Sequence, residues 1–67
     1  MNKIDMATDV IVINSATAFR QFRKVMLRAG LGTVTIVTAY GEPRAVVVPV
    51  EMWERWQQAE AEAEAAQ

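Results

Sequence analysis

Residues 33–50 place the strongest constraint on how this chain can fold. Two segments rich in β-branched residues flank the sequence Tyr-Gly-Glu-Pro at residues 40–43. β-Branched side chains favour strands because they pack well on a pleated surface. Gly41 can adopt a positive φ without steric cost, and Pro43 biases Glu42 toward an extended conformation. The stretch therefore predicts a β-hairpin with a loop slightly longer than the tightest type.

A first helix is predicted over residues 15–29, after a short apolar strand at Asp9–Ile13. Asn14 and Ser15 end this strand and suit the N-cap, because their side chains can accept hydrogen bonds from free N–H groups of the first turn. Apolar residues at spacings of three and four predict one helix face that packs on the sheet. Its members are Ala18, Phe19, Phe22, Val25, Met26 and Ala29.

A second helix is predicted after the hairpin, over Glu51–Ala66. Pro49 cannot donate to a strand ladder, so the second hairpin strand is expected to end near Val48. The apolar stripe of this helix comprises Met52, Trp53, Trp56 and Ala59. Beyond that stripe the sequence favours a helix but is low in complexity and has no large apolar residue. Residues 51–67 thus form a helix that either frays at its outer end or begins a partner-binding segment.

The predicted order is β-α-β-β-α, an α+β fold in which a small three-stranded sheet, antiparallel or mixed, packs with helices on one side. Residues 1–67 make a single domain, which buries only about 60% of the surface of its unfolded chain. The chain has no Cys, so a disulfide cannot supply the missing stability. Because Val46–Val48 is apolar on both faces, we expect a homodimer in which a partner's sheet or helix covers the second face.

The composition argues against catalysis, metal binding and a cofactor. Cys and His are absent, which removes the commonest zinc ligands, Cys nucleophiles and the commonest general base. Ser15 is the only serine and is better explained as a helix cap. No carboxylate pair is predicted in an apolar pocket, where its pKa could be tuned for acid–base chemistry. With neither a signal peptide nor an apolar run long enough to cross a bilayer, a cytoplasmic protein with no membrane partner is expected.

The charges of the chain are segregated. Residues 1–44 carry six basic and three acidic side chains, whereas residues 45–67 carry one basic and five acidic ones. Four of the cations recur along the first helix, namely Arg20, Arg23, Lys24 and Arg28. Lys and Arg neutralise phosphates, and neutral donors at the helix start, on Asn14, Ser15 and Thr17, suit a phosphate or a base edge. This pattern predicts a DNA-binding surface; the alternative is an ordinary solvated helix face.

Two aromatic features have alternative interpretations. Trp53 and Trp56 can form a partner-binding hot spot, since Trp is enriched in such sites. Their spacing beside Met52 favours the other interpretation, in which they pin the second helix onto the sheet. Tyr40, beside the hairpin turn, either contacts a partner or simply flanks the turn.

Several segments, in the same order and spacing, resemble the Phd/YefM family of antitoxins from prokaryotic type II toxin–antitoxin modules. The resemblance covers roughly Val10 to Trp56. It rests on Ile13-Asn14 followed by Thr17-Ala18, the amphipathic helix through Val25-Met26, Gly32, and the hairpin sequence Val37–Pro49, VTAYGEPRAVVVP.

The resemblance implies a homodimer that binds operator DNA, represses its own operon and neutralises a cognate toxin through its C-terminal segment. The DNA contacts that it implies are Asn14, Ser15, Thr17, Arg20, Arg23 and Lys24, with Lys3 as a further contact. Phe19 stands where many family members carry a basic residue, and Arg20 follows one position later. The toxin-binding part either centres on Met52, Trp53 and Trp56 or lies outside this chain. The alternative is a protein-interaction module that binds a partner through the second helix without binding DNA.

Overall fold

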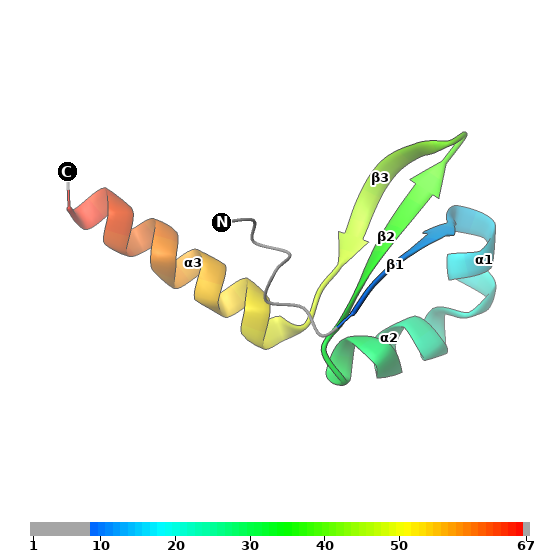
Figure 1. Ribbon diagram of the computed structural model, residues 1–67, viewed down its shortest axis with the longest axis horizontal. Helices are drawn as coiled ribbons and strands as arrows, with labels where there is room; N and C mark the ends of the chain where they lie inside the picture. Colours follow the sequence, from blue (N-terminus) through cyan, green and yellow to red (C-terminus); the bar gives the residue numbers. More distant parts are fainter. Residues whose placement is uncertain (1–8, 67) are drawn as a thin grey trace.

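The computed structural model describes residues 9–66, a small α+β domain with a three-stranded mixed sheet and three helices (Figure 1). The elements are β1 (Asp9–Asn14), α1 (Ser15–Arg20), α2 (Phe22–Gly30), β2 (Thr33–Ala39), β3 (Glu42–Val47) and α3 (Val50–Ala65). The α+β class and the three strands are therefore confirmed. Lys3, a predicted DNA contact, lies outside the described residues.

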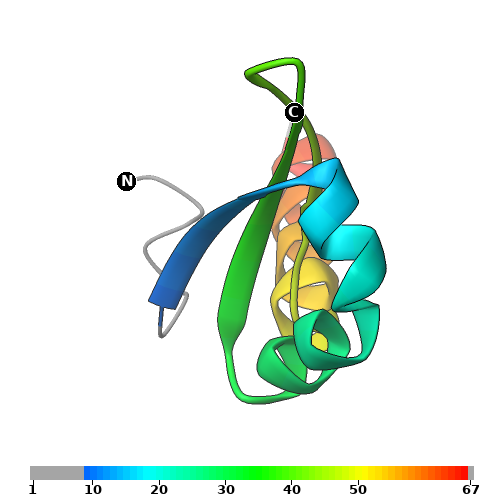
Figure 2. The same ribbon diagram turned by 90° about the vertical axis from the view of Figure 1, so that its right-hand side faces the viewer.

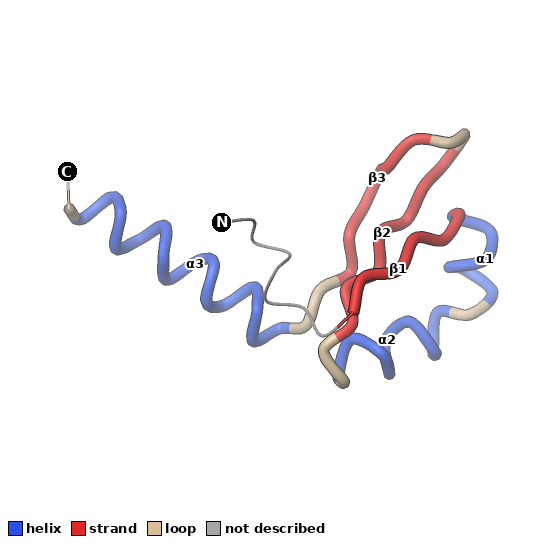
Figure 3. The backbone as a smooth tube through the Cα atoms, in the orientation of Figure 1, coloured by secondary structure: helices blue, strands red, loops and turns tan. Residues whose placement is uncertain are grey.

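The sheet has the strand order β1-β2-β3, with β2 in the centre (Figure 3). β1 is parallel to β2, with Ile11 opposite Thr35, and β3 is antiparallel to β2, with Val46 opposite Ile36. The parallel pair requires a crossover connection, which α1 and α2 supply. Figure 2 shows these two helices together in front of the sheet, with α3 behind it.

The hairpin turn is shorter than the sequence predicts. Only Tyr40 and Gly41 lie between β2 and β3, with φ angles of 55° and 77°. Positive φ at both central residues is the geometry of a type I′ turn, whose twist matches that of the flanking strands. The prediction of a longer loop is wrong because Glu42 and Pro43 already belong to β3. The pairing register between β2 and β3 instead shifts between Val37 and Thr38.

Replacing Tyr40 with Asn is expected to raise the free energy of unfolding by about 1 kcal/mol, because a left-handed conformation penalises side chains other than Gly, Asn and Asp. The Tyr40 side chain is fully exposed, so its removal sacrifices no packing within residues 9–66. Urea titration at fixed protein concentration measures the change. Tyr40→Ala is the matched control: it removes the ring but keeps the penalty, and an equal gain from it would contradict this account.

The predicted helix over residues 15–29 is divided at Gln21. Gln21 has φ −112° and ψ 27°, outside helical values, and separates α1 from α2. Its N–H still donates to the carbonyl oxygen of Thr17 at 2.9 Å, and its carbonyl oxygen accepts from Val25 N–H at 3.0 Å. The hydrogen bonds therefore continue through a bend. Neither Pro nor Gly marks this bend in the sequence, so nothing there predicts it.

The helix layer buries fewer apolar side chains than predicted. Ala18, Val25 and Ala29 are buried, together with Val34 of the central strand and Met52. The other members of the predicted apolar face, Phe19, Phe22 and Met26, are exposed, so this part of the prediction is wrong. α1 and α2 contact mainly β1 and β2, and a three-stranded sheet is too narrow to cover a wider arc of the helices.

The last helix, α3, leaves the sheet on the side opposite α1 and α2 (Figure 1). The radius of gyration is 13.5 Å, whereas a compact domain of this length has about 11 Å. Met52 is buried at the base of α3, but Trp53 is 51% exposed. The predicted packing of Trp53 onto the sheet is therefore wrong, as is the placement of all helices on one side. None of the helices described within residues 9–66 has the length and apolar character needed to cross a membrane.

Candidate nucleic-acid interface

The helix pair carries the basic surface, defined as Arg20 on α1 and Arg23, Lys24 and Arg28 on α2. All four side chains are exposed. Within residues 9–66 no carboxylate forms an ion pair with any of them. Among the described residues, Arg20 alone of the four has a side-chain partner, donating from Nη2 to Thr17 Oγ1 at 3.4 Å. The surface is therefore uncompensated positive charge, which suits a polyanion.

The junction of β1 and α1 brings four predicted DNA contacts together: Asn14, Ser15, Thr17 and Arg20. Asn14 is the N-cap of α1, and its Oδ1 accepts from the Thr17 N–H at 2.8 Å. This confirms Asn14 as a predicted cap, and it also occupies one acceptor of the Asn14 side chain. The prediction of Ser15 as a cap is wrong, because Ser15 is the first residue of α1 itself. Ser15 is exposed and Thr17 is half-buried. Arg23, Lys24 and Arg28 lie farther along the chain, on α2.

The strand register also brings the hairpin to this junction. Asn14 lies opposite Thr38, two residues before the turn. Beyond the turn, Arg44 forms an ion pair with Glu42 at 3.5 Å, with both side chains exposed. Arg44 therefore differs from the four cations of the basic surface, because a carboxylate already neutralises it.

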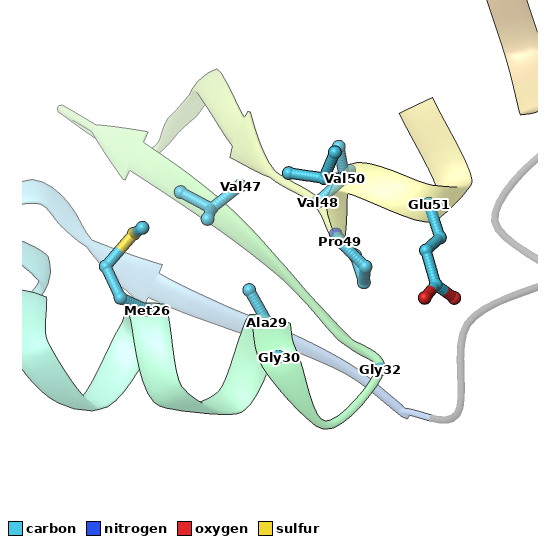
Figure 4. A pocket seen from close by; sticks show the side chains of 9 residues that line it. All are labelled: Met26, Ala29, Gly30, Gly32, Val47, Val48, Pro49, Val50 and Glu51. Carbon is cyan, nitrogen blue, oxygen red and sulfur yellow. The ribbon is translucent and has the colours of Figure 1, made fainter. Parts of the chain in front are cut away.

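A groove with a volume of about 390 Å³ lies between the end of α2 and the connection from β3 to α3 (Figure 4). Apolar side chains dominate it, and Glu51 is its one titratable lining residue among those the structure describes. The lining residues are Met26, Ala29, Gly30, Gly32, Val47, Val48, Pro49, Val50 and Glu51. Nothing in the sequence predicts this groove, because the apolar spacing places Met26 against the sheet.

The three residues predicted for toxin binding have different accessibilities. Met52 is buried and is part of the core, whereas Trp53 is about half exposed and Trp56 is intermediate. Trp53 is therefore the most accessible of the three. It belongs to the first turn of α3, the helix that extends away from the sheet and the first two helices (Figure 1).

Residues 9–66 contain no group of three or more His, Cys, Asp or Glu side chains that could hold a metal ion. Comparison of the chain with protein families, with curated proteins and with solved structures finds no match.

Proposed function

We propose that this chain is a cytoplasmic antitoxin of the Phd/YefM type: a homodimer that binds operator DNA, represses its own operon and neutralises a cognate toxin. The proposal includes no catalytic step and no cofactor. The observation that carries it is the basic surface, whose four exposed cations have no carboxylate partner within residues 9–66. Releasing counterions from DNA favours binding to such a surface without any base-specific contact.

The arrangement of the β1–α1 junction supports the same proposal. Ser15 is exposed there, and the Thr17 hydroxyl oxygen accepts a hydrogen bond from the Arg20 guanidinium at 3.4 Å. Polar groups beside cations position a protein on the phosphate backbone. A two-fold dimer presents this surface twice, so an operator with two related half-sites is expected.

The position of α3 supports the second part of the proposal, the neutralisation of a toxin. α3 extends away from the sheet, and an exposed Trp is a common anchor in protein interfaces. We place toxin contact on Trp53 and Trp56, with Met52 holding the base of the helix in the core. The proposal expects a neighbouring gene that encodes a small protein, and the product of such a gene is the test partner.

Simultaneous replacement of Arg20 and Arg23 by Ala is expected to weaken binding to a duplex from the region upstream of the gene by at least about tenfold at fixed salt. The slope of log affinity against log salt should fall by about two, one for each lost phosphate contact. Fluorescence anisotropy with a labelled duplex measures both quantities, and circular dichroism checks the fold.

The control is Arg55→Ala, which removes one positive charge from α3, away from the basic surface. It should leave affinity nearly unchanged. If the double variant and the unaltered protein bound DNA with equal affinity, the helix pair would not be the DNA-binding surface.

The exposure of Trp53 favours a second candidate, a protein-interaction module that binds its partner through α3 and does not bind DNA. Apolar docking by Trp53 depends little on salt, whereas phosphate contacts are steeply salt-dependent. A salt-insensitive complex with the neighbouring gene product, lost in Trp53→Ala, together with no DNA binding, would select this candidate.

A further inference from the structure

Both phenylalanines of the chain lie on the solvent side of the helix pair. Phe19 of α1 is 86% exposed, and Phe22 of α2 is 57% exposed. A single exposed apolar side chain is ordinary in a protein surface, but an aromatic ring brings a large apolar area with it. The buried side chains within residues 9–66 are those of Ala, Val, Met and one Thr. The core therefore uses neither ring.

The two rings are interleaved with the cations of the basic surface. Arg20 directly follows Phe19, and Arg23 directly follows Phe22. Residues three or four apart are neighbours on a helix surface, so Phe19 is a neighbour of both Phe22 and Arg23. The backbone hydrogen bonds on either side of Gln21 keep the helical repeat through the bend. The helix pair therefore presents aromatic rings and guanidinium groups on one surface.

We propose that this surface binds single-stranded nucleic acid, with phosphates on the cations of the basic surface and bases stacked on Phe19 and Phe22. Proteins that bind single strands combine cations, which follow the phosphates, with aromatic side chains, which stack on the unpaired bases. The cations have no carboxylate partner within residues 9–66, so they attract a polyanion. Every base has a π face, so little sequence preference is expected.

The exposed rings distinguish this ligand from a duplex. The cations can contact the phosphates of a duplex without help from the rings. A ring that enters a duplex must first unstack two base pairs, which costs free energy. The bases of a single strand are free to stack on a ring without this cost. The single-strand site shares its cations with the proposed operator surface, and it goes beyond the proposed function because it also uses Phe19 and Phe22.

The position of the rings favours nucleic acid over a membrane surface. A helix that lies in a membrane interface separates its apolar face from its charged face. The apolar face of α2, which includes Val25 and Ala29, is already buried where α2 contacts the sheet. Phe19 and Phe22 lie instead among cations, in the same alternation that phosphates and bases have along a single strand.

Fluorescence anisotropy with a labelled, mixed-sequence DNA strand of about 12 nucleotides, a length in the usual range of such sites, measures the binding. Phe19→Ala and Phe22→Ala are each expected to weaken it at least about fivefold at fixed salt, because a stacked base is lost. Phe19→Trp keeps a ring and should retain the affinity, whereas Phe19→Leu keeps an apolar side chain without a ring and should lose it.

Leu31→Ala is the matched control. Leu31 is the C-cap residue of α2, and its side chain is 77% exposed. This substitution also removes an exposed apolar side chain but no ring, so the affinity for the strand should stay nearly unchanged. Circular dichroism checks that each variant keeps the fold.

Two further probes separate the contributions of base, phosphate and sugar. A strand of the same length whose nucleotides all lack the base keeps the phosphates, so it should bind more weakly and be insensitive to Phe19→Ala. An RNA strand of the same sequence offers the same phosphates and base faces, so its binding should also depend on Phe19. The tighter of the DNA and RNA complexes identifies which strand the surface prefers.

Equal affinity for the complete and the base-free strand, or equal affinity of Phe19→Ala and the unaltered protein, would overturn the proposal. Binding to vesicles of equimolar phosphatidylserine and phosphatidylcholine without binding to either strand would overturn it in favour of a membrane surface. Ring-dependent binding of a strand without binding of the upstream duplex would support this site and overturn the proposed operator binding. Binding of the duplex alone, unchanged in Phe19→Ala, would do the reverse.

Discussion

Val25→Asp is expected to unfold the domain at neutral pH. Val25 is only 1% exposed and lies in the layer where α2 meets the sheet. An unpaired carboxylate in that position loses its hydration without gaining a partner, a change that destabilises proteins by about 4 kcal/mol or more. Small domains have total stabilities of only about 5 kcal/mol or slightly more. Loss of the helical circular dichroism signal, or a urea midpoint near zero, measures this outcome.

Leu27→Asp is the matched control for this substitution. Leu27 is two residues away in α2, and its side chain is mostly exposed. The same charge should therefore change stability there by less than about 1 kcal/mol. If both variants unfolded to the same extent, burial of Val25 could not be the cause.

Thr35→Val is expected to stabilise the protein by about 1–2 kcal/mol. Thr35 is 1% exposed, and its Oγ1 atom is buried with no hydrogen-bond partner within residues 9–66. Leaving a buried polar group unsatisfied costs about 1–3 kcal/mol, and Val has nearly the same shape with a methyl group in place of the hydroxyl. Urea unfolding at fixed protein concentration measures the gain, since an association equilibrium would otherwise shift the midpoint.

Thr38→Val tests the physical reason. Thr38 lies in the same strand, but its hydroxyl donates to the carbonyl oxygen of Ile13 at 3.4 Å. Losing that bond should leave stability unchanged or lower it. A gain from Thr38→Val as large as that from Thr35→Val would indicate strand propensity as the cause, and not the unsatisfied hydroxyl.

The sequence was most informative where a residue type has one strong local preference. β-Branched runs located the three strands, and Asn14 was correctly identified as a cap, because both signals depend on nearby backbone only. The parallel pairing of β1 with β2 could not be distinguished beforehand, because it depends on where the helix pair returns the chain. The two-residue turn is not predicted from the sequence, because Tyr40 occupies one of its positions and a Tyr at positive φ is uncommon.

Apolar spacing predicts a wider buried face on the first helix than the structure has. The prediction that all helices lie on one side of the sheet is also wrong for α3. A spacing rule identifies which side chains share a face, but not how wide a sheet is available to cover them. Phe19, Phe22 and Met26 are exposed for this reason. The four cations were correctly placed on the surface because charged side chains avoid burial wherever the helix lies. Their lack of carboxylate partners became visible only in three dimensions.

The position of α3 determines what the intrinsic fluorescence of this protein reports. Both tryptophans of the chain, Trp53 and Trp56, lie in α3. Near-ultraviolet emission therefore monitors the projecting helix, while far-ultraviolet dichroism averages over sheet and helices. The two signals need not coincide during unfolding, and a mismatch would measure the independence of α3 from the sheet. Because both tryptophans lie in α3, a change in their emission would also report the binding of any macromolecule that covers this helix, without an added label.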